Sequence, residues 1–444
     1  MPRLITRLPA DDRTNGWSAL LPKRTPRPPL EGEHSFDWVI VGMGYAGIAA
    51  ARRLAELRPH DSIALVDSGE VGENASGRNS GFAIDLPHVP STSAASVEQG
   101  RRAIRVNRFV MAELEKQIVA HGIDCGWARR GRYHAAVTAK VAASALDSYA
   151  ANLDAWGEPY EALAGDALAA RLGTPYYHSA IYTPGTCLMN PAALVRGLAD
   201  SLPASVSRFE HSAVIEIEPG GAAPYVRTAR GRIRFGKLIL AVNPFAQSFG
   251  VFENRQIPML LFASLTRPLT SAQLAKLGTD PSWGITPAHG VAGSTLRLTP
   301  DHRLLIRQGF EYSPSLSTNE ARRSAARAQH AQLLAGRFGH LGHLGELEIE
   351  HFWMGWLGIS HNHAPAFGQV SEHVYAAACC NGSGIVRHTA AGRLIAEHAL
   401  GEHSELADDF LIQGTASYIP PRPLRDLGVL WTIRREQASG KAEV

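Results

Sequence analysis

The feature that most constrains the fold of this sequence is a glycine-rich turn set between two short apolar runs. Trp38–Val41 is apolar and largely β-branched, as expected for a buried parallel strand. It leads into the motif Gly42-x-Gly44-x-x-Gly47, which is followed by an alanine-rich stretch that predicts a helix. A second apolar run then ends on an acidic residue, Asp67. Strand, glycines, helix, strand and acid in this order predict a βαβ unit that binds a dinucleotide.

The residues around this turn have separate roles in dinucleotide binding. The first glycine permits a tight turn, the second lets the backbone approach a pyrophosphate, and the third lets helix and strand pack closely. The N-terminus of the helix, with Tyr45 and Ala46, then faces the phosphates. Asp67, followed by Ser68, is placed to accept a hydrogen bond from a ribose hydroxyl. An ordinary βαβ unit with a glycine-rich turn is the alternative, and the complete context of the motif disfavours it.

A second glycine-rich segment, residues 71–82, is small and polar, as suits backbone wrapped around a ligand. Here the chain resembles the D-amino-acid-oxidase superfamily of FAD-dependent amine oxidoreductases. The resemblance is closest to the gamma-glutamylputrescine oxidase-like branch, with glycine oxidase and monomeric sarcosine oxidase as more distant members. It runs from about Trp17 to about Arg435, and it implies FAD as the cofactor. It also implies that one segment passes beside the pyrophosphate and the isoalloxazine ring: Ala75, Ser76, Gly77, Arg78, Asn79, Ser80 and Gly81.

Other segments are expected to contact the cofactor as well. A strand at 374–378, a turn rich in Gly, Asn and Ser, and a following helix predict a second site of the helix N-terminal type. A helix start that only caps itself is the alternative. The resemblance implies that this turn holds the flavin and its ribityl chain and that the backbone of Val214 meets the adenine. The cofactor contacts expected outside the first two segments are Val214, Ala241, Asn243, Gly358, Asn381, Gly382, Ser383, Gly384 and Ile385.

The expected fold class is α/β. We expect a Rossmann-type FAD-binding domain, interleaved with a substrate domain built on a mostly antiparallel β-sheet flanked by helices. The expected boundaries are 1–36 for an N-terminal arm, 37–98 with 188–252 and 352–402 for the FAD-binding domain, 99–187 with 253–351 for the substrate domain, and 403–444 for a C-terminal arm. Trp17 is expected to anchor the first arm, which otherwise lies extended on the surface.

Local signals predict several helix boundaries. Residues 102–120 have a helical apolar stripe, and Gly122 suits the position just past the helix end. Asn190 followed by proline predicts a capped helix start. Ser317-x-x-Glu320 is typical of a capping box that opens a long helix to about Phe338.

Composition limits the classes of partner. The net charge is only +3 and the arginines are scattered, so no nucleic-acid partner is expected. Four cysteines in 444 residues do not indicate a disulfide scaffold. There is no apolar run of membrane-spanning length and no signal-peptide core, so we expect a cytoplasmic protein without membrane insertion. The resemblance implies a small-molecule amine as the substrate. The sequence does not indicate an oligomeric state.

The resemblance implies a reaction that needs little from the protein beyond positioning. A hydride passes from the carbon bearing a neutral amine to flavin N5, and the imine is hydrolysed to an aldehyde and an amine or ammonia. Oxygen or another acceptor reoxidises the flavin. Arg307 occupies the place where monomeric sarcosine oxidase-like enzymes have a cationic lysine beneath the flavin, and a surface strand arginine is the alternative.

Three further residues are candidates for the pocket wall. His361 or His363 is expected to line it from a closing loop. Both histidines invite a metal interpretation, but no third ligand lies at a recognisable spacing, so no metal is expected. Trp356 is expected to form an aromatic wall for the substrate, with burial in the core as the alternative.

An absence also bears on the substrate. In glycine oxidase-like members, an arginine in a Gly-Leu-Arg-Pro turn clamps the α-carboxylate, but residues 355–360 here contain no arginine. This favours an amine whose charge lies farther from the reacting carbon. Two alternatives are open: an amino-acid oxidase whose clamp comes from Arg307, Arg132 or Arg297, and a flavin-binding subunit without turnover.

FAD is expected to bind without a covalent bond. We call the glycine-rich segment of residues 71–82 the flavin loop. Covalent members of the superfamily use a cysteine in the turn that corresponds to residues 355–357, or a histidine in the flavin loop. In this chain the first place holds Gly-Trp-Leu, and Asn79 stands at the second. Cys379 and Cys380 lie beyond the following strand.

Overall fold

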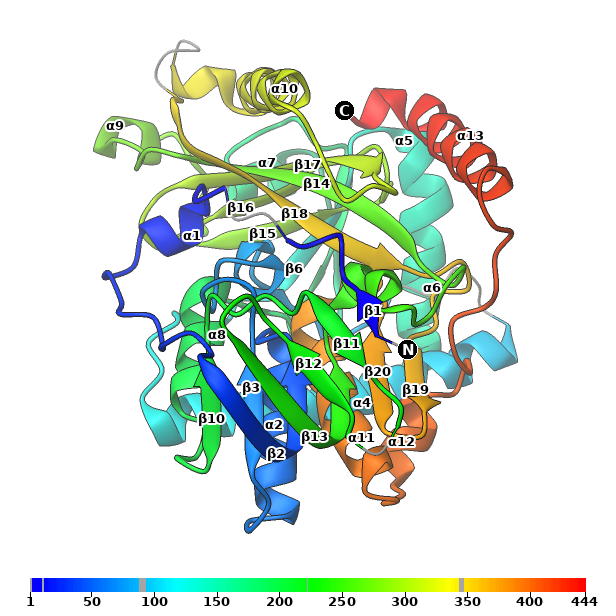
Figure 1. Ribbon diagram of the computed structural model, residues 1–444. Coiled ribbons are helices and arrows are strands. Elements are labelled where there is room, and N and C mark those ends of the chain that lie inside the picture. The colour runs from blue at the N-terminus through cyan, green and yellow to red at the C-terminus, as the bar shows by residue number, and fades with distance from the viewer. Residues whose placement is uncertain (1, 10–11, 88–92, 222, 343–346) are drawn as a thin grey trace.

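The computed structural model describes residues 2–9, 12–87, 93–221, 223–342 and 347–444. The chain forms two halves that each contain a large sheet (Figure 1). Helices α2, α4, α8 and α11 lie with the sheet of the lower half, and α10 covers the sheet of the upper half (Figure 1). The chain crosses between the halves several times, so each half contains segments that are far apart in sequence.

The lower sheet has nine strands in the described residues, in the order β1-β11-β12-β13-β2-β3-β10, with β20 and β19 attached through β13. Its centre is parallel, because β13, β2, β3, β10 and β20 run in one direction. The apolar runs of the sequence form these central strands, as expected for a sheet that is covered on both faces. The strands are β1 Arg3–Leu4, β2 Gly32–Val41, β3 Ile63–Val66, β10 Val206–Phe209, β11 Glu216–Glu218, β12 Tyr225–Arg227, β13 Gly231–Leu240, β19 Ala366–Ser371 and β20 Val374–Ala378.

The upper sheet has eight strands in the described part of the chain, in the order β18-β14-β17-β16-β15-β6-β8-β7. Every neighbouring pair is antiparallel except β15 with β6. The strands are β6 Arg132–Ala136, β7 Glu161–Ala164, β8 Ser179–Thr183, β14 Ile257–Thr266, β15 Trp283–Pro287, β16 Thr295–Leu298, β17 Leu304–Tyr312 and β18 Ile349–Ile359. A parallel α/β half joined to a mostly antiparallel half confirms the predicted fold class.

Three short strands, β4 Phe82–Ala83, β9 Cys187–Leu188 and β5 Ala128–Arg129, form a separate small sheet in the order β4-β9-β5. The α-helices are α1 Gly16–Ala19, α2 Tyr45–Leu57, α3 Ala75–Arg78, α4 Ala94–His121, α5 Ala139–Val141, α6 Asp147–Trp156, α7 Gly165–Leu172, α8 Pro191–Asp200, α9 Ser271–Leu274, α10 Glu320–Phe338, α11 Gly384–Ala399, α12 Glu405–Phe410 and α13 Leu424–Ser439. Short turns of other helix types are η1 Ala142–Leu146, η2 Asn243–Phe249, η3 Gly339–Leu341 and η5 Lys441–Glu443.

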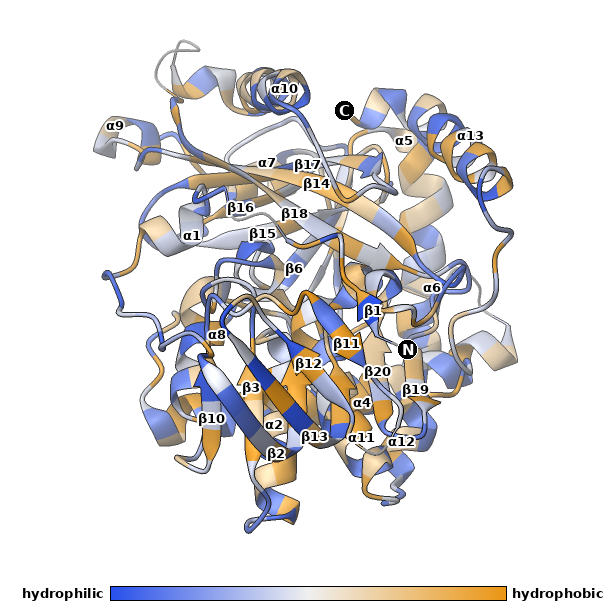
Figure 2. Cartoon of the chain, viewed as in Figure 1, coloured by the Kyte–Doolittle hydropathy of each residue, from blue (hydrophilic) through white to orange (hydrophobic). Residues whose placement is uncertain are grey.

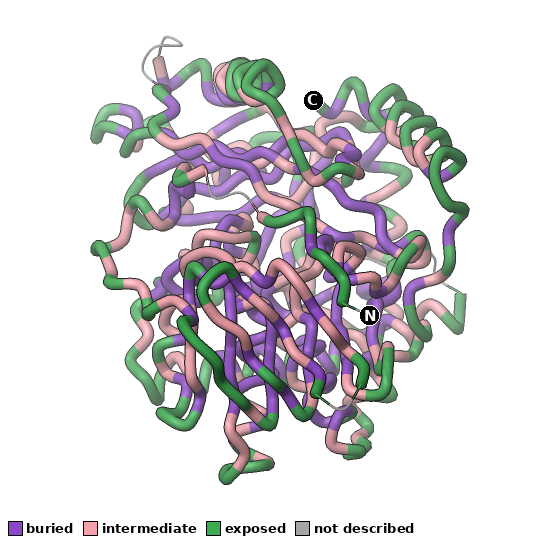
Figure 3. Tube along the Cα trace, in the orientation of Figure 1, coloured by how far each residue is buried: buried purple, intermediate pink, exposed green. Residues whose placement is uncertain are grey.

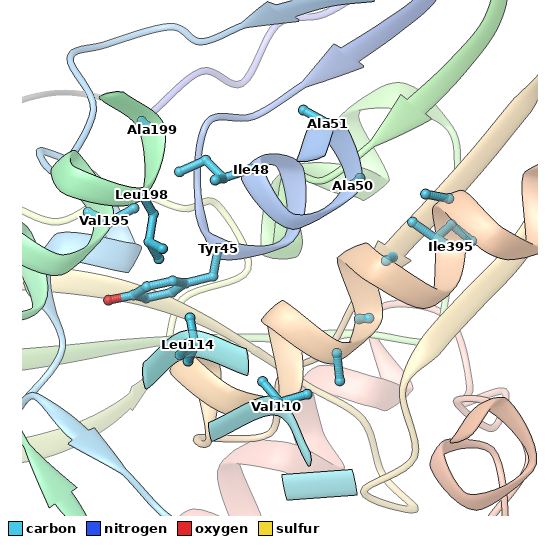
Figure 4. Packing of buried hydrophobic residues seen from close by; sticks show 14 of the residues in the cluster. Tyr45, Ile48, Ala50, Ala51, Val110, Leu114, Val195, Leu198, Ala199 and Ile395 are labelled. Atoms are coloured by element: carbon cyan, nitrogen blue, oxygen red, sulfur yellow. The ribbon is translucent and has the colours of Figure 1, made fainter. Parts of the chain in front are cut away.

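The core of the lower half is built on helix α2. Tyr45 and Ile48 of α2 pack against Leu198 of α8 and Leu114 of α4, while Ile395 of α11 lies on the other side (Figure 4). Helix α11 approaches α2 closely because its contact residue is glycine: a Cβ at position 392 would collide with the carbonyl oxygen of Ala46. This packing fixes the N-termini of α2 and α11 relative to each other.

The upper sheet has two unlike faces. Tyr133, Ile285, Leu296 and Ile306 form one row across four strands, and all four are buried in the core beneath α10. Because successive side chains of a strand point to opposite faces, the neighbouring row faces the other way, toward the lower half. The strands of the upper sheet are largely buried, whereas α10 and α13 are exposed along their outer sides, where hydrophilic residues are frequent (Figures 2 and 3).

Some predicted helix boundaries are confirmed and two are wrong. Helix α4, predicted to begin at residue 102, begins at Ala94 with Ser93 as its N-cap. Gly122 ends α4 in the left-handed conformation, with φ of 60°, and Asn190 caps α8 through its side chain. Helix α10 does not use the predicted capping box, because Asn319 rather than Ser317 is the N-cap and accepts from the backbone N–H of Arg322. Strand β2 also begins at Gly32, six residues before the apolar run, where it pairs with the start of β13.

None of the helices in the described ranges is long and apolar enough to cross a membrane.

Candidate cofactor and substrate site

A cavity with about 860 Å³ of empty space, its open mouth included, lies at the carboxyl ends of β2, β3 and β13. This is the position at which open parallel sheets bind ligands. Gly42 and Gly44 line it from the turn after β2, Asp67 from the end of β3, and Val214 and Ala241 from the segments beside β11 and β13. The predicted pyrophosphate, ribose and adenine contacts therefore share one cavity.

The glycines of the first turn have no room for side chains. Gly42 has φ of 107°, a conformation that favours glycine, and an added Cβ would lie 2.5 Å from the carbonyl oxygen of Ala241. A Cβ at Gly44 would lie 2.6 Å from the hydroxyl of Ser76. A Cβ at Gly47 would collide with the carbonyl oxygen of Gly42, which has no freedom to move aside. Close approach of backbone to a ligand and of helix to strand explains all three positions.

Asp67 is the acidic residue of this cavity, and its carboxylate also accepts hydrogen bonds from several surrounding segments. It accepts hydrogen bonds from the backbone N–H groups of Met43 at 2.6 Å and Gly69 at 3.0 Å, and from the amide of Asn74 at 3.1 Å. Burial raises its pKa, and the backbone N–H groups of Gly69 and Met43 oppose that rise. Asp67 thus joins the glycine turn to the flavin loop, while it remains in the cavity lining.

A second and larger cavity, with about 1670 Å³ of empty space, adjoins the first under the upper sheet. The two share lining residues, among them Tyr45, Ser76, Asn243, Trp356 and His388. Segment 75–80 lies along the boundary and contributes to both. One elongated ligand with a dinucleotide end and a ring end therefore has continuous space.

The turn 381–384 closes this space from the N-terminus of α11. Asn381, with φ of 51°, accepts from the N–H of Ser360 and donates to the carbonyl oxygens of His363 and Cys379. Its side chain holds the turn against loop 360–364 and is not free to bind a ligand by itself. Helix α11 has no side-chain cap, so its first N–H groups face the cavity without a partner side chain.

His388 lies on α11 where the two cavities meet, and sequence reasoning missed it. Its Nε2 atom is buried, without a hydrogen-bond partner in the described part of the chain. Burial and the neighbouring Arg387 lower the pKa of His388 to about 4, so the ring is neutral at physiological pH. An unsatisfied polar atom at the junction, together with glycines that leave no room for Cβ atoms, fits a bound dinucleotide cofactor.

A polar row on the lower face of the upper sheet forms one wall of the larger cavity. Arg307 of β17 stands directly opposite Thr295 of β16 and donates to its hydroxyl at 2.6 Å. Arg132 of β6 donates to the hydroxyl of Thr286 of β15 at 3.3 Å and to Tyr149 at 3.0 Å. Since Thr286 and Thr295 lie on neighbouring strands, the two guanidinium groups share one wall.

Burial lowers the pKa of Arg307 to about 10, which leaves the group cationic at neutral pH. None of the described residues that line the larger cavity is an aspartate or glutamate. Arg78 also lies there, but Asp12 pairs with it at 2.8 Å. The substrate end of the site is therefore positive, with apolar walls from Leu261, Phe310 and other side chains.

The predicted site residues fall into three groups. The residues that line a cavity are Arg307, Trp356, Gly42, Gly44, Tyr45, Ala46, Asp67, Ser68, Ala75, Ser76, Arg78, Asn79, Ser80, Val214, Ala241, Asn243, Asn381, Gly382, Ser383, Gly384 and Ile385. Four glycines lie behind the lining, where a Cβ would meet protein atoms: Gly47, Gly77, Gly81 and Gly358. His361 and His363 are both exposed, but of the two only His363 lines a cavity, the larger one, so the predicted site residue His361 lies outside the site.

The structure also separates the three candidate carboxylate clamps. Arg307 and Arg132 line the larger cavity. Arg297 does not: its Nη1 donates to the carbonyl oxygens of Ser80, Gly81 and Met189, which uses it to hold the flavin loop. The pairings that place these arginines join strands from distant parts of the chain, so no local sequence signal reports them.

Positions relevant to covalent attachment are also visible. Asn79 donates to the carbonyl of Ser76 and accepts from the N–H of Gly81, a structural role in the loop. Cys380 lines the larger cavity, although its place in the sequence suggested otherwise. Burial raises the pKa of the Cys380 thiol, which disfavours the nucleophilic thiolate.

The fold and the paired cavities define a class: dinucleotide-binding α/β proteins in which a second sheet closes the reactive end of the cofactor. The chain belongs to the DAO family of FAD-dependent oxidoreductases, whose model matches residues 37–398. FAD is accordingly its cofactor, and the protein is an oxidoreductase.

The individual relatives share about a quarter of their residues or fewer with this chain. A probable oxidoreductase, OrdL, from Rhizobium meliloti is 27% identical over 400 residues, which covers 88% of this chain and 89% of that protein. The gamma-glutamylputrescine oxidoreductase of Escherichia coli is 25% identical over 401 residues, with coverage of 87% and 88%. The crystal structure of glycine oxidase from Geobacillus kaustophilus has the same fold, with a TM-score of 0.72, 19% identity, and coverage of 87% of this chain and all of that one.

Proposed function

We propose that the protein oxidises a primary or secondary amine that bears a carboxylate at a distance from the reacting carbon. The amine becomes an imine, which water hydrolyses to an aldehyde and an amine or ammonia. Bound FAD supplies the hydride acceptor for this oxidation. The observation that supports the proposal is the wall of the larger cavity, which presents Arg132 and Arg307 and no carboxylate among its described residues.

This wall acts on both ends of such a substrate. A carboxylate gains charge-assisted hydrogen bonds from a guanidinium, worth about 1.5–3 kcal/mol each. An ammonium group is disfavoured by the same cations and by the apolar surroundings, so the site lowers the pKa of the bound amine. The neutral amine is the form that can release a hydride from its carbon. Positive charge on the wall therefore selects the substrate and prepares it.

The positions of the arginines favour a remote carboxylate. Both are held on strands of the upper sheet by threonine hydroxyls, whereas residues 355–360, where an α-carboxylate clamp is expected, contain no arginine. The Escherichia coli relative is a gamma-glutamylputrescine oxidoreductase, which supports an amine substrate. Oxidation of an α-amino acid is the second candidate, because Arg132 or Arg307 is also able to hold an α-carboxylate.

A matched set of substrates separates the candidates. We expect 4-aminobutyrate to bleach the flavin under anaerobic conditions faster than butylamine, and butylamine faster than alanine. In Arg307→Met and Arg132→Met, kcat/KM for 4-aminobutyrate should fall about 30-fold, which corresponds to ~2 kcal/mol. The value for butylamine should fall much less, because butylamine has no carboxylate and loses only the effect of the cation on its amine. Arg130→Met is the control, since Arg130 is exposed and lies outside the lining.

Other outcomes have clear meanings. Fastest bleaching by alanine would establish the amino-acid oxidase instead. Equal rates for butylamine and 4-aminobutyrate would remove the carboxylate from the proposal. If neither these compounds nor a wider panel of amines bleached the flavin, a flavin-binding subunit without turnover would be the better description.

A further inference from the structure

The N-terminal arm contributes to the dinucleotide cavity through part of its described residues 2–9, although it precedes the glycine turn in the sequence. Arg7, Leu8 and Pro9 line the smaller cavity together with Gly42 and Asp67. The arm lies outside the segment 37–398 that matches the family. Its contact with the cavity is therefore a property of this chain's own N-terminal segment.

The arm is held in place on both sides of Arg7. Before it, β1 pairs with β11, and the N–H of Ile5 donates to the carbonyl oxygen of Ile215 at 2.8 Å. After it, Asp12 pairs with Arg78 of the flavin loop at 2.8 Å. Arg7 itself reaches across to the upper half, where Nη1 donates to the carbonyl oxygen of Pro314 at 2.8 Å. In Figure 1 this segment runs between the two halves.

Arg7 supplies the positive charge of the smaller cavity. It is the sole lysine or arginine among the described residues of that lining, and its side chain is exposed to solvent. The second basic residue, His388, is neutral at physiological pH because its pKa lies near 4. Asp67, whose pKa burial raises, is the acidic residue of the same cavity and adds no positive charge. A cofactor with a diphosphate thus meets partial charges from N–H groups and the α2 dipole, and one complete positive charge.

We propose that Arg7 binds the diphosphate of FAD and that the arm segment Arg7–Pro9 covers this part of the cofactor. The guanidinium provides paired donors that suit phosphate oxygens. Cofactor binding then joins three separate parts of the chain: the glycine turn, the flavin loop and the N-terminal arm. The arm is a component of the cofactor site and not a linker.

The test compares Arg7→Gln with Arg3→Gln in the full-length holoenzyme. Arg3 lies on the same arm and pairs with Glu253 at 3.0 Å, but it does not line the cavity. We expect Arg7→Gln to release FAD about tenfold faster than wild type at low salt, as measured by the recovery of flavin fluorescence. The difference should shrink in about 0.5 M salt, because ions screen an exposed charge. Arg3→Gln should match wild type.

A second measurement locates the contact on the cofactor. Full-length apoprotein of each variant is titrated with ADP and with adenosine. Arg7→Gln should weaken ADP about as much as FAD, and leave adenosine unchanged. Equal losses for ADP and adenosine would show that the arm only seals the cavity, and unchanged FAD release would remove Arg7 from the site; either result overturns the proposal. Unchanged melting of the apoprotein confirms that the variant folds normally.

Discussion

The two cavities of the site are lined by different parts of the protein. The smaller one includes the glycine turn and the N-terminus of α2, where an added Cβ at Gly42 or Gly44 would meet protein atoms. The larger one has a wall of side chains from six strands of the upper sheet, β6, β14, β15, β16, β17 and β18, which meet through cross-strand pairing. The first arrangement suits a ligand that never changes, and the second suits a substrate that can differ between relatives.

This difference has a consequence for mutation. Backbone contacts cannot be exchanged one at a time, so a single methyl group at the dinucleotide end should abolish binding. Side chains on a sheet can be replaced singly with the sheet intact, so changes at the substrate end should alter selectivity and leave the cofactor in place. The predictions below test this contrast in order of decreasing effect.

Gly47→Ala should give protein without bound flavin. The added Cβ collides with the carbonyl oxygen of Gly42, so helix α2 must move away from the strand and the pyrophosphate turn opens. We expect less than about a tenth of the wild-type flavin content, read from absorbance after purification. Gly336→Ala is the control, because a Cβ there meets nothing within 4 Å. Full flavin loading of Gly47→Ala would contradict the assigned turn.

Replacement of the two loop histidines should distinguish a residue that lines the larger cavity from one that does not. His363→Ala removes a side chain from the wall of the larger cavity and should raise KM for the best amine about three- to tenfold with flavin content unchanged. His361→Ala, on the same loop but outside the lining, should behave as wild type. Steady-state kinetics on the two variants provide the measurement. A larger effect from His361→Ala would reverse the placement of this loop.

Asp12→Asn should weaken the tie between the arm and the flavin loop. Burial acts to raise the pKa of Asp12, but the charge of Arg78 and a hydrogen bond from Arg323 outweigh it, and the pKa falls to about 2. Because the pKa of the folded state is depressed, the stabilisation is present above the unfolded value near 4 and is lost as pH falls toward 2.

After allowance for solvent screening, we expect a loss of about 1–2 kcal/mol at pH 7 in Asp12→Asn. Thermal melting as a function of pH measures it. The difference in stability between wild type and variant should vanish below about pH 2, where the wild-type carboxyl is protonated as well. A difference that stays constant from pH 7 to pH 2 would show that the charge of Asp12 is not responsible.

Cys380→Ser should not change the amount of flavin that acid precipitation releases. This is the smallest of the expected effects. FAD is predicted to bind without a covalent bond, so acid precipitation should move all the yellow colour into the supernatant for both proteins. Cys380 is the relevant control because it lines the larger cavity and is the cysteine best placed to react. Colour that remains in the wild-type pellet but not in the Cys380→Ser pellet would identify a thioether to this residue.

The same contrast explains what the sequence could predict. The glycine turn, the flavin loop and the turn before α11 are local motifs, so their residues were found by spacing and resemblance. Thr286 and Thr295 were missed because their role depends on strand register: Thr295 matters only once it stands opposite Arg307. The parallel pairing of β15 with β6, which brings Thr286 to Arg132, joins segments that are about 150 residues apart.

The other residues that sequence reasoning missed or misassigned depend on burial and hydrogen bonding in the folded protein. His388 was missed because nothing in its local sequence shows that its ring is buried at the junction of two cavities. Arg297 was a plausible clamp by residue type, but backbone carbonyls satisfy it. The capping box at Ser317 was displaced by Asn319, a side chain that caps equally well and lies directly before the helix.

The position of the N-terminal arm has a consequence for the order of assembly in the cell. The arm is synthesised before its partners: β11 follows about 200 residues later, and Pro314 and Arg323 about 300 residues later. Asp12 can pair with Arg78 early, but until β11 and Pro314 leave the ribosome, Arg3–Leu4 and Arg7 lack the partners described above, and the dinucleotide pocket stays open along this side. Cofactor can therefore enter a nearly complete chain from the side, and docking of the arm becomes a late step of maturation.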